Sequence, residues 1–264
     1  MLAAIDWHVV WKQLFHPDGV FARALWTTVY MAVIAQVLGV VLGLIAALMR
    51  TSKVWGLRWL SGIYVWLFRG TPVLVQIVFI YYSNLIIPGF HPIPNTLNLG
   101  LFKVDGAVFA GILALGINEG AYMREIIRAG IDAIDKGQME AARSLGMTYR
   151  LAMRRVVLPQ AARVIVPPLG NEFNNMLKTT SLVTIIAVHE MFQDAEIRYS
   201  QDFKPIEYFG SVAIWYLLLT TVWTFIQAWI ERRLAVSERG EEVPFWERVV
   251  EAWTPVQAWA RGAR

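Results

Sequence analysis

The 264-residue sequence contains no cysteine and few charged residues. Without cysteine the chain has no disulfide, no thiolate ligand for a metal and no cysteine nucleophile. Asp, Glu, Lys and Arg make up 17% of the residues, against about 25% in soluble globular proteins. Hydrophobic residues account for 56%, and the mean hydropathy is +0.46. This balance excludes an ordinary soluble domain and predicts a polytopic membrane protein.

Several motifs that carry chemistry are absent as well. The sequence has no G-x-x-x-x-G-K-[ST] loop to hold nucleotide phosphates, no His, Asp and Glu spacing typical of a metal site, and no set of nucleophile, base and orienting residue. We therefore expect that the chain is not an enzyme and has no cofactor, no metal site and no nucleic-acid partner. Any energy source has to be supplied by a separate chain.

Two uncharged runs are long enough to cross the bilayer. Residues 24–49 are 26 residues without a charge and residues 208–230 are 23, whereas a helix needs about 20 to cross the hydrocarbon. These runs predict the first and last spans. Residues 1–23, which contain Lys12 and Pro17 but no uninterrupted apolar core, predict an external amphipathic segment.

Three less regular apolar segments predict the remaining spans, which gives an all-α bundle of about five transmembrane helices. Residues 59–87 are interrupted at Arg69–Pro72, where we expect a break in the second span. Residues 106–131 and 161–188 carry charged residues in their interiors. Such charges are costly unless they are paired or face a polar pathway, so spans three and four should face protein rather than lipid.

The distribution of Lys and Arg predicts the orientation. Alternate loops, starting with the one after the first span, carry fourteen of these residues, and the segments on the opposite side carry five. Because Lys and Arg gather on the cytoplasmic side, the N-terminus should lie outside and the C-terminus inside. We expect an external segment 1–23, a transmembrane domain 24–235 and a cytoplasmic tail 236–264, which is either a Trp-bearing amphipathic helix or a partly ordered tail.

The longest cytoplasmic loop, residues 132–159, contains a motif of small residues. In order it has Glu140, Ala141, Ala142, Gly146, Val156, Leu158 and Pro159. The pattern predicts a short helix with a small-residue face, ended by a left-handed glycine, and then a second basic helix closed before Pro159. On physical grounds the loop is either an ordinary helical connection or a rigid surface that docks into another protein.

The spacing of this motif resembles the signature loop of permease subunits of binding-protein-dependent ATP-binding-cassette importers, with Val156 where Ile is more usual. Four further stretches, at 69–76, 119–126, 137–140 and 169–182, resemble the polar amino acid group of these permeases. The resemblance covers about residues 20–235. It implies the fold of a type I ABC importer permease, with a cytoplasmic coupling helix.

The resemblance also implies partners. In this family the loop docks into a cytoplasmic ATPase subunit, a role that would fall here to Glu140, Ala141, Ala142 and Gly146. A second permease, either a copy of this chain or a paralogue, would complete the pathway in the lipid bilayer. An extracytoplasmic substrate-binding protein would deliver the amino acid. The expected location is the inner (plasma) membrane.

The fourth span has a polar face that suits an amino acid ligand. At 100° per residue one arc holds Asn171, Asn174, Asn175, Lys178 and Ser181, with Glu172 at its edge. Glu172 lies 13 residues beyond Pro159, or about 20 Å along a helix, near the middle of the bilayer unless Pro167-Pro168 break the helix. The arc offers a carboxylate for an ammonium group, donors for a carboxylate, and amides. Alternatively these groups pair with one another and serve assembly.

Other polar residues inside the spans are interpreted as structural. The resemblance marks Glu119, Tyr122 and Glu125 as signature positions of the third span, and their helical spacing favours ion pairing within the bundle. Arg69 and Pro72 should set the break of the second span and a buried charge contact.

Together these features predict a permease subunit that forms the translocation pathway of an ATP-driven importer for polar amino acids. Two alternatives stay open. An ion-coupled secondary transporter would need coupling-ion sites and usually repeated broken-helix halves, which are not visible in the sequence. A non-transporting membrane scaffold would leave the charged residues of the fourth span unexplained.

Overall fold

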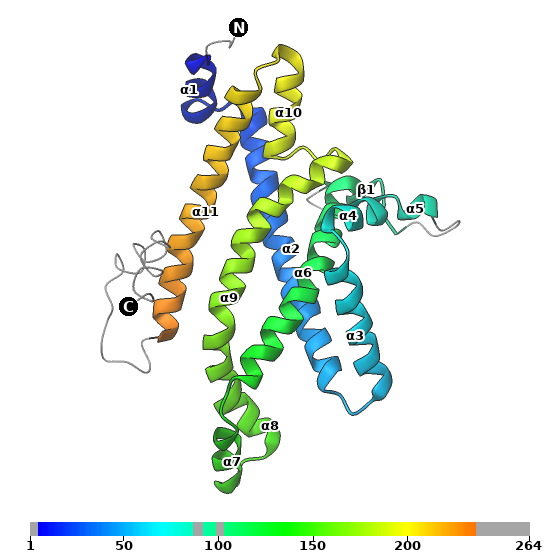
Figure 1. Cartoon of the computed structure of the whole chain (residues 1–264), viewed down its shortest axis with the longest axis vertical. Coiled ribbons are helices and arrows are strands. Elements are labelled where there is room, and N and C mark those ends of the chain that lie inside the picture. The colour runs from blue at the N-terminus through cyan, green and yellow to red at the C-terminus, as the bar shows by residue number, and fades with distance from the viewer. Residues whose placement is uncertain (1–4, 87–91, 99–102, 236–264) are drawn as a thin grey trace, which may run out of the picture.

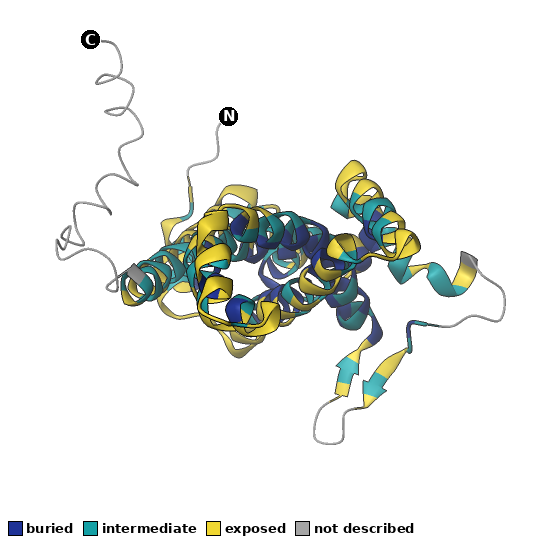
Figure 2. Cartoon of the chain, turned by 90° about the horizontal axis from the view of Figure 1, so that it is seen from below, coloured by how far each residue is buried: buried dark blue, intermediate teal, exposed yellow. Residues whose placement is uncertain are grey.

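The structure, a computed structural model, describes residues 5–86, 92–98 and 103–235. The expected tail 236–264 lies outside the described residues. Over the described part the chain is helical apart from one antiparallel hairpin, so the predicted all-α bundle is confirmed. The long helices run along the longest axis of the molecule (Figure 1). Figure 2 shows buried residues between the helices and exposed residues on their outer faces.

The elements follow one another in this order: α1 (Trp7–Phe15), α2 (Gly19–Thr51), α3 (Trp55–Gly70), α4 (Val73–Tyr81), α5 (Ser83–Ile86), β1 (Thr96–Asn98), β2 (Lys103–Asp105), α6 (Gly106–Asp132), α7 (Lys136–Ser144), α8 (Tyr149–Ala152), the π-helix η1 (Met153–Val157), α9 (Leu158–Thr179), the 3-10 helix η2 (Thr180–Ile186), α10 (Met191–Asp202) and α11 (Pro205–Ala235). Among the described residues, α2, α6 and α11 are long and apolar enough to cross a membrane, and the bent pair α3 and α4 makes a fourth span if the two are counted together. The remaining expected span, the fourth in chain order, corresponds to α9, a helix of 22 residues that is more polar.

The second span breaks where the sequence predicts. Helices α3 and α4 are bent by 107° across Thr71 and Pro72. Thr71 is extended because the ring of the following proline disfavours a helical conformation for the residue before it. The side chain of Gln76 donates from Nε2 to the carbonyls of Phe68 (2.9 Å) and Thr71 (3.0 Å). These bonds satisfy carbonyls that the break would otherwise leave without donors in a membrane.

Helices α2 and α6 pack backbone to backbone through glycines. Gly39 and Gly43 on α2 meet α6, and Gly116 and Gly120 on α6 meet α2, each pair four residues apart. A Cβ atom at Gly43 would lie 2.4 Å from the Cβ atom of Met123. Small residues at this spacing let transmembrane helices approach closely, which gives dispersion contacts in a solvent that offers no hydrophobic drive.

The main core lies where α2, α4, α6, α9 and η2 meet. Its fully or nearly fully buried side chains include Met31, Ile77, Leu115, Met176 and Val183, one from each of these elements. Met176 therefore faces inward. The opposite face of α9 is left for polar residues.

The chain does not break before Pro159, and the prediction of a closed second helix was wrong. Helix α8 continues through η1 into α9, and Pro159 lies in the first turn of α9. The amide of Leu158 donates to the carbonyl of Met153, five residues back. This π-type turn shifts the hydrogen-bond register just before the proline, which has no N–H, so the helix continues.

Helix α9 also continues through Pro167 and Pro168. Side chains of α11 support this region, because Gln227 Nε2 donates to the carbonyl of Pro167 (3.2 Å) and Trp223 Nε1 donates to that of Gly170 (2.8 Å). Polar side chains of a neighbouring helix are a usual way of tolerating proline in a membrane helix.

The predicted short helix of the cytoplasmic loop is confirmed as α7. It ends at a left-handed glycine, Gly146, with φ of 84°. The amide of Met147 donates to the carbonyl of Ala142 and that of Gly146 donates to Arg143, which is a Schellman motif. Figure 1 shows α7 and α8 at one end of the molecule, beyond the long helices, and α1 and α10 at the other.

At the end that carries α10, an ion-pair group holds α10 to the start of α2. Arg198 donates to Asp18 (2.8 Å) and to the buried Asp194 (2.6 Å). Asp18 is the N-cap of α2 and accepts from the amides of Val20 and Phe21. The bond from Phe21, together with Arg198, lowers the pKa of Asp18 below its ordinary value of 3.8.

We expect Gly43→Ala to destabilise the fold, because the added methyl group has to displace the backbone of α6 near Met123. Overpacking of this kind costs about 1–3 kcal/mol. Gly62→Ala is the matched control, since a Cβ atom there meets nothing within 4 Å and alanine favours a helix. Thermal unfolding in detergent measures both. A melting temperature for Gly43→Ala as high as that of Gly62→Ala would show that α2 and α6 do not pack as described.

The Asp18 contacts predict a loss of stability in acid. A carboxyl whose folded-state pKa is lowered contributes stability above its unfolded pKa, and this is lost as the pH falls through the folded value. Asp18 is partly exposed, so the effect should be below about 1 kcal/mol. Asp18→Asn keeps the cap but removes the charge. Melting curves between pH 7 and 3 should converge for the two proteins in acid, and a constant difference would contradict the contribution of the charge.

Candidate functional site

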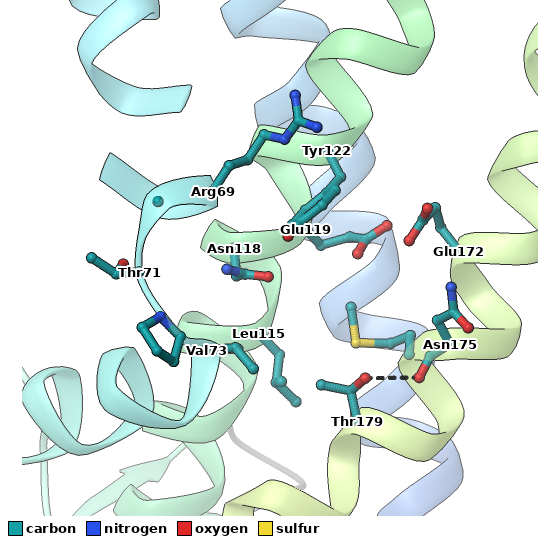
Figure 3. A pocket seen from close by; sticks show the side chains of 13 residues that line it. Arg69, Thr71, Val73, Leu115, Asn118, Glu119, Tyr122, Glu172, Asn175 and Thr179 are labelled. Atoms are coloured by element: carbon teal, nitrogen blue, oxygen red, sulfur yellow. Dashed lines mark hydrogen bonds between the residues drawn. The ribbon is translucent and has the colours of Figure 1, made fainter. Parts of the chain in front are cut away.

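A polar cavity lies at the break of the second span. It has a volume of about 580 Å³, within the range of small-molecule sites, and is enclosed by the α3–α4 break, α6 and α9. Its charged lining residues are Arg69, Glu119 and Glu172, and its uncharged polar ones are Thr71, Asn118, Tyr122, Asn175 and Thr179. Figure 3 shows these side chains converging from the three sides.

Two carboxylates face one another across this cavity. Figure 3 shows Glu119 on α6 and Glu172 on α9 turned toward each other. Glu119 is buried and accepts a hydrogen bond from Gln36 Nε2 at 3.2 Å. Glu172 is half-buried and, among the described residues, has no hydrogen-bond or ion-pair partner. Within the described part of this single chain, Glu172 and Lys178 line different hollows and form no ion pair.

One cation belongs to the same site. The guanidinium of Arg69, at the end of α3, lies over the ring of Tyr122 at 5.2 Å from its centroid. This contact is a cation–π interaction, which orients the arginine while leaving its N–H groups available. Sequence analysis assigned Arg69, Pro72, Glu119 and Tyr122 to structure, whereas all four line the cavity together with Glu172.

Amide side chains fix the wall of the cavity. Asn118 Nδ2 donates to the carbonyl of Phe68 and to Oε1 of Gln76, both at 3.0 Å, which ties α6 to both halves of the broken span. Sequence analysis did not assign Gln36 or Gln76 a role. The sequence indicates such a role for both glutamines, because an amide side chain in an apolar run has to find a partner inside the protein.

The polar arc predicted for the fourth span is divided by the structure. Glu172 and Asn175 line the cavity, and the side chain of Asn175 carries no other partner among the described residues. Lys178 and Ser181 instead border a second hollow of about 430 Å³ beside α10 and α11, together with Phe192 and other residues. Lys178 borders a different hollow because it lies six residues after Glu172 on α9, which at 100° per residue turns the two side chains about 120° apart.

The other two residues of the arc lie toward α11 or inside the bundle. Asn171 accepts a hydrogen bond from Gln227 Nε2 of α11 at 3.3 Å. Asn174 Oδ1 is buried without a hydrogen-bond partner among the described residues. Neither residue lines the first cavity.

A line of charges continues along α6 from the cavity toward α7. Glu125 contacts Arg124 and pairs with Arg128 at 3.3 Å, and Arg128 also pairs with Asp132 at 2.7 Å. Arg124 is buried, and its Nε atom has no hydrogen-bond partner among the described residues. Glu125 therefore lies in ion pairs within its own helix rather than in the cavity.

The predicted docking residues do not all face outward. Glu140, Ala141 and Gly146 are exposed, whereas Ala142 is 4% exposed and faces the segment formed by α8 and η1, which α7 contacts. The small side chain of Ala142 thus serves packing of the loop itself. The outward face of α7 is marked by Glu140 and Ala141.

The polar residues beyond η2 belong to the opposite end. His189 Nε2 lies 3.1 Å from Oδ1 of Asp194, and the buried Glu190 caps α10 and accepts from Tyr216 Oη at 2.7 Å. In the part of the chain that the structure describes, no three His, Asp or Glu residues are grouped as a metal site would require.

Comparison with known proteins gives consistent matches. A family model described as binding-protein-dependent transport system inner membrane component matches residues 39–236. The arginine transport system permease protein ArgU of Corynebacterium glutamicum is 38% identical over 237 residues, covering 87% of this chain and 72% of ArgU. The L-cystine transport system permease protein TcyB of Bacillus subtilis is 38% identical over 232 residues, covering 88% and 92%.

The likeness extends to a solved structure. A chain from the crystal structure of an amino acid ABC transporter with histidines is 38% identical, with a TM-score of 0.70. The match covers 81% of this chain and 94% of that chain.

The hydrogen bonds of the cavity wall predict different effects for two asparagines. Asn118→Leu keeps the size of the side chain but leaves Oε1 of Gln76 without its donor and removes one of the two donors to the carbonyl of Phe68. We expect a loss of about 1–3 kcal/mol in unfolding free energy. Asn175→Leu breaks no side-chain bond and should leave stability nearly unchanged. Denaturation in detergent compares the two, and equal losses would contradict the described network.

Proposed function

The chain belongs to the family of binding-protein-dependent transport system inner membrane components and is a multi-pass permease subunit of an ATP-binding-cassette importer, and we propose that its cavity is the point at which polar amino acids pass. One observation carries this proposal. Glu119 and Glu172 face one another inside the bundle, where the cost of burying a charge is high unless the charge has a function or a partner.

We assign substrate contact to Glu172 and Asn175. Both lie on the cavity, and both have side chains without other partners among the described residues. Arg69 adds a cation for the carboxylate of an amino acid. Lys178 and Ser181 border the second hollow, where a substrate would meet them at another stage of its passage. Asn171 and Asn174 act in packing between α9 and its neighbours.

The substrate class rests on the relatives. Their names assign arginine to one and L-cystine to the other, and the related crystal structure is of an amino acid ABC transporter. These names support an amino acid for this chain but differ in the side chain that they imply. The ATP-driven reading is favoured over an ion-coupled transporter and over a scaffold by the family itself.

We propose that a separate ATPase chain docks on the outward face of α7, around Glu140 and Ala141. The helix projects beyond the bundle and ends in a rigid Schellman motif, so it can enter a groove on a partner (Figure 1). A second permease, identical or paralogous, completes the pathway. A substrate-binding protein delivers the ligand at the opposite end, where α10 and its ion pairs lie.

This arrangement includes an orientation. The end formed by α7, α8 and η1 carries the exposed Arg143, Arg150, Arg154 and Arg155. By the positive-inside rule this end is cytoplasmic, which leaves α1 outside and the tail inside. Labelling of single cysteines, introduced into this cysteine-free chain at each end, reports the orientation directly.

The proposal is tested by purifying the tagged chain with its natural partners and measuring amino acid uptake into liposomes. Uptake should require ATP and should persist when ion gradients are dissipated. Uptake that follows an ion gradient without ATP would contradict the assignment.

The docking face gives a matched pair of variants. Ala141→Trp places a bulky ring on the outward face of α7, and we expect at least a tenfold loss of ATP-driven uptake with an unchanged melting temperature. Thr51→Trp, at the exposed last residue of α2, should transport normally. Co-purification of the ATPase measures docking in both. Full ATPase binding and uptake by Ala141→Trp would move the docking site elsewhere.

A further inference from the structure

The positive and negative charges of the side chains that line the cavity do not balance. Its lining holds two carboxylates, Glu119 and Glu172, and one guanidinium, Arg69. Its remaining lining residues, apart from the phenol of Tyr122, do not ionise. Lys178 borders the second hollow, and Glu125 is paired with arginines of its own helix, so neither changes this balance.

An amino acid with a neutral side chain does not balance all the charges of this site. Its carboxylate matches Arg69 and its ammonium group matches one glutamate. The second glutamate then has no cation as partner, and a charge that is partly withdrawn from water without a partner is costly. A ligand with a second positive group balances both glutamates and the arginine.

The positions of the carboxylates favour the same ligand. Glu119 and Glu172 approach from opposite walls, on α6 and α9, so that a cation between them contacts both (Figure 3). Glu119 is held in place, because its stem lies against Gly39 and its Oε1 accepts from Gln36. Only Glu172, with no partner among the described residues, has to adjust.

We propose that this cavity selects amino acids with a cationic side chain, whose guanidinium or ammonium group binds between Glu119 and Glu172. The inference rests on the proposed function, since it takes the cavity to be the substrate site. It adds a specificity that acts in the permease itself, independent of any selection by a binding protein.

The test measures binding to the purified full-length chain in detergent, without partners. The probes are L-arginine and L-citrulline, which have nearly the same shape but differ in the charge of the side chain. Wild-type protein should bind arginine with a dissociation constant at least tenfold lower than that for citrulline. This comparison needs no variant and cannot be confused with misfolding.

Two variants then test whether Glu119 and Glu172 cause the preference for arginine. Glu172→Gln and Glu119→Gln should each reduce the preference for arginine toward unity, mainly by weakening arginine binding. Glu231→Gln is the control, because this glutamate lies near the end of α11, bonds to Gln227 of its own helix and does not line the cavity. It should keep the wild-type preference.

Three results would overturn the inference. The first is equal binding of arginine and citrulline, or tighter binding of citrulline, by the wild type. The second is displacement of arginine by sodium chloride but not by choline chloride at the same ionic strength, which would mean that the carboxylates hold an inorganic cation. The third is undetectable binding of both amino acids. If the assembled transporter still imports a neutral amino acid with ATP, only the proposal of a cation site is contradicted. Absence of all amino acid uptake contradicts the proposed function itself.

Discussion

The close approach of α2 and α6 is the constraint on which the rest of the structure depends. Gly39, Gly43, Gly116 and Gly120 remove the side chains that would hold the two backbones apart. The same contact places the stem of Glu119 against Gly39, where Gln36 reaches its carboxylate. Helix packing and the position of a buried charge are therefore linked, because a larger residue at Gly39 would displace both α6 and the side chain of Glu119.

The second requirement is that backbone groups exposed by the broken span find donors. Gln76 and Asn118 supply them from α4 and α6, so side chains of both neighbouring elements hold the break. A break stabilised in this way lets the end of α3 place Arg69 at the cavity, over Tyr122. The polar cavity is thus a consequence of how the carbonyls at the break are hydrogen-bonded. Irregular backbone at the depth of the membrane is tolerated because it lines a cavity.

The sequence predicts features that depend on local chemistry. Apolar length defines the spans, the Thr71-Pro72 step defines the break, and Gly146 defines the end of α7. It does not predict which polar residues meet, because that depends on how α3, α6 and α9 pack. Sequence periodicity grouped Lys178 with Glu172 on one wide arc, but the two residues lie about 120° apart on α9 and border different hollows.

The unbroken helical path through η1 connects the proposed docking surface at α7 with the cavity. A proline at the start of the fourth span predicted a joint there, which would have let the loop and the span move separately. Instead α8, η1 and α9 form one helical rod from the segment that packs against α7 to Glu172 and Asn175. Gln227 and Trp223 hold this rod to α11 near its prolines. A partner that displaces α7 would therefore act on the cavity wall through a continuous helical path.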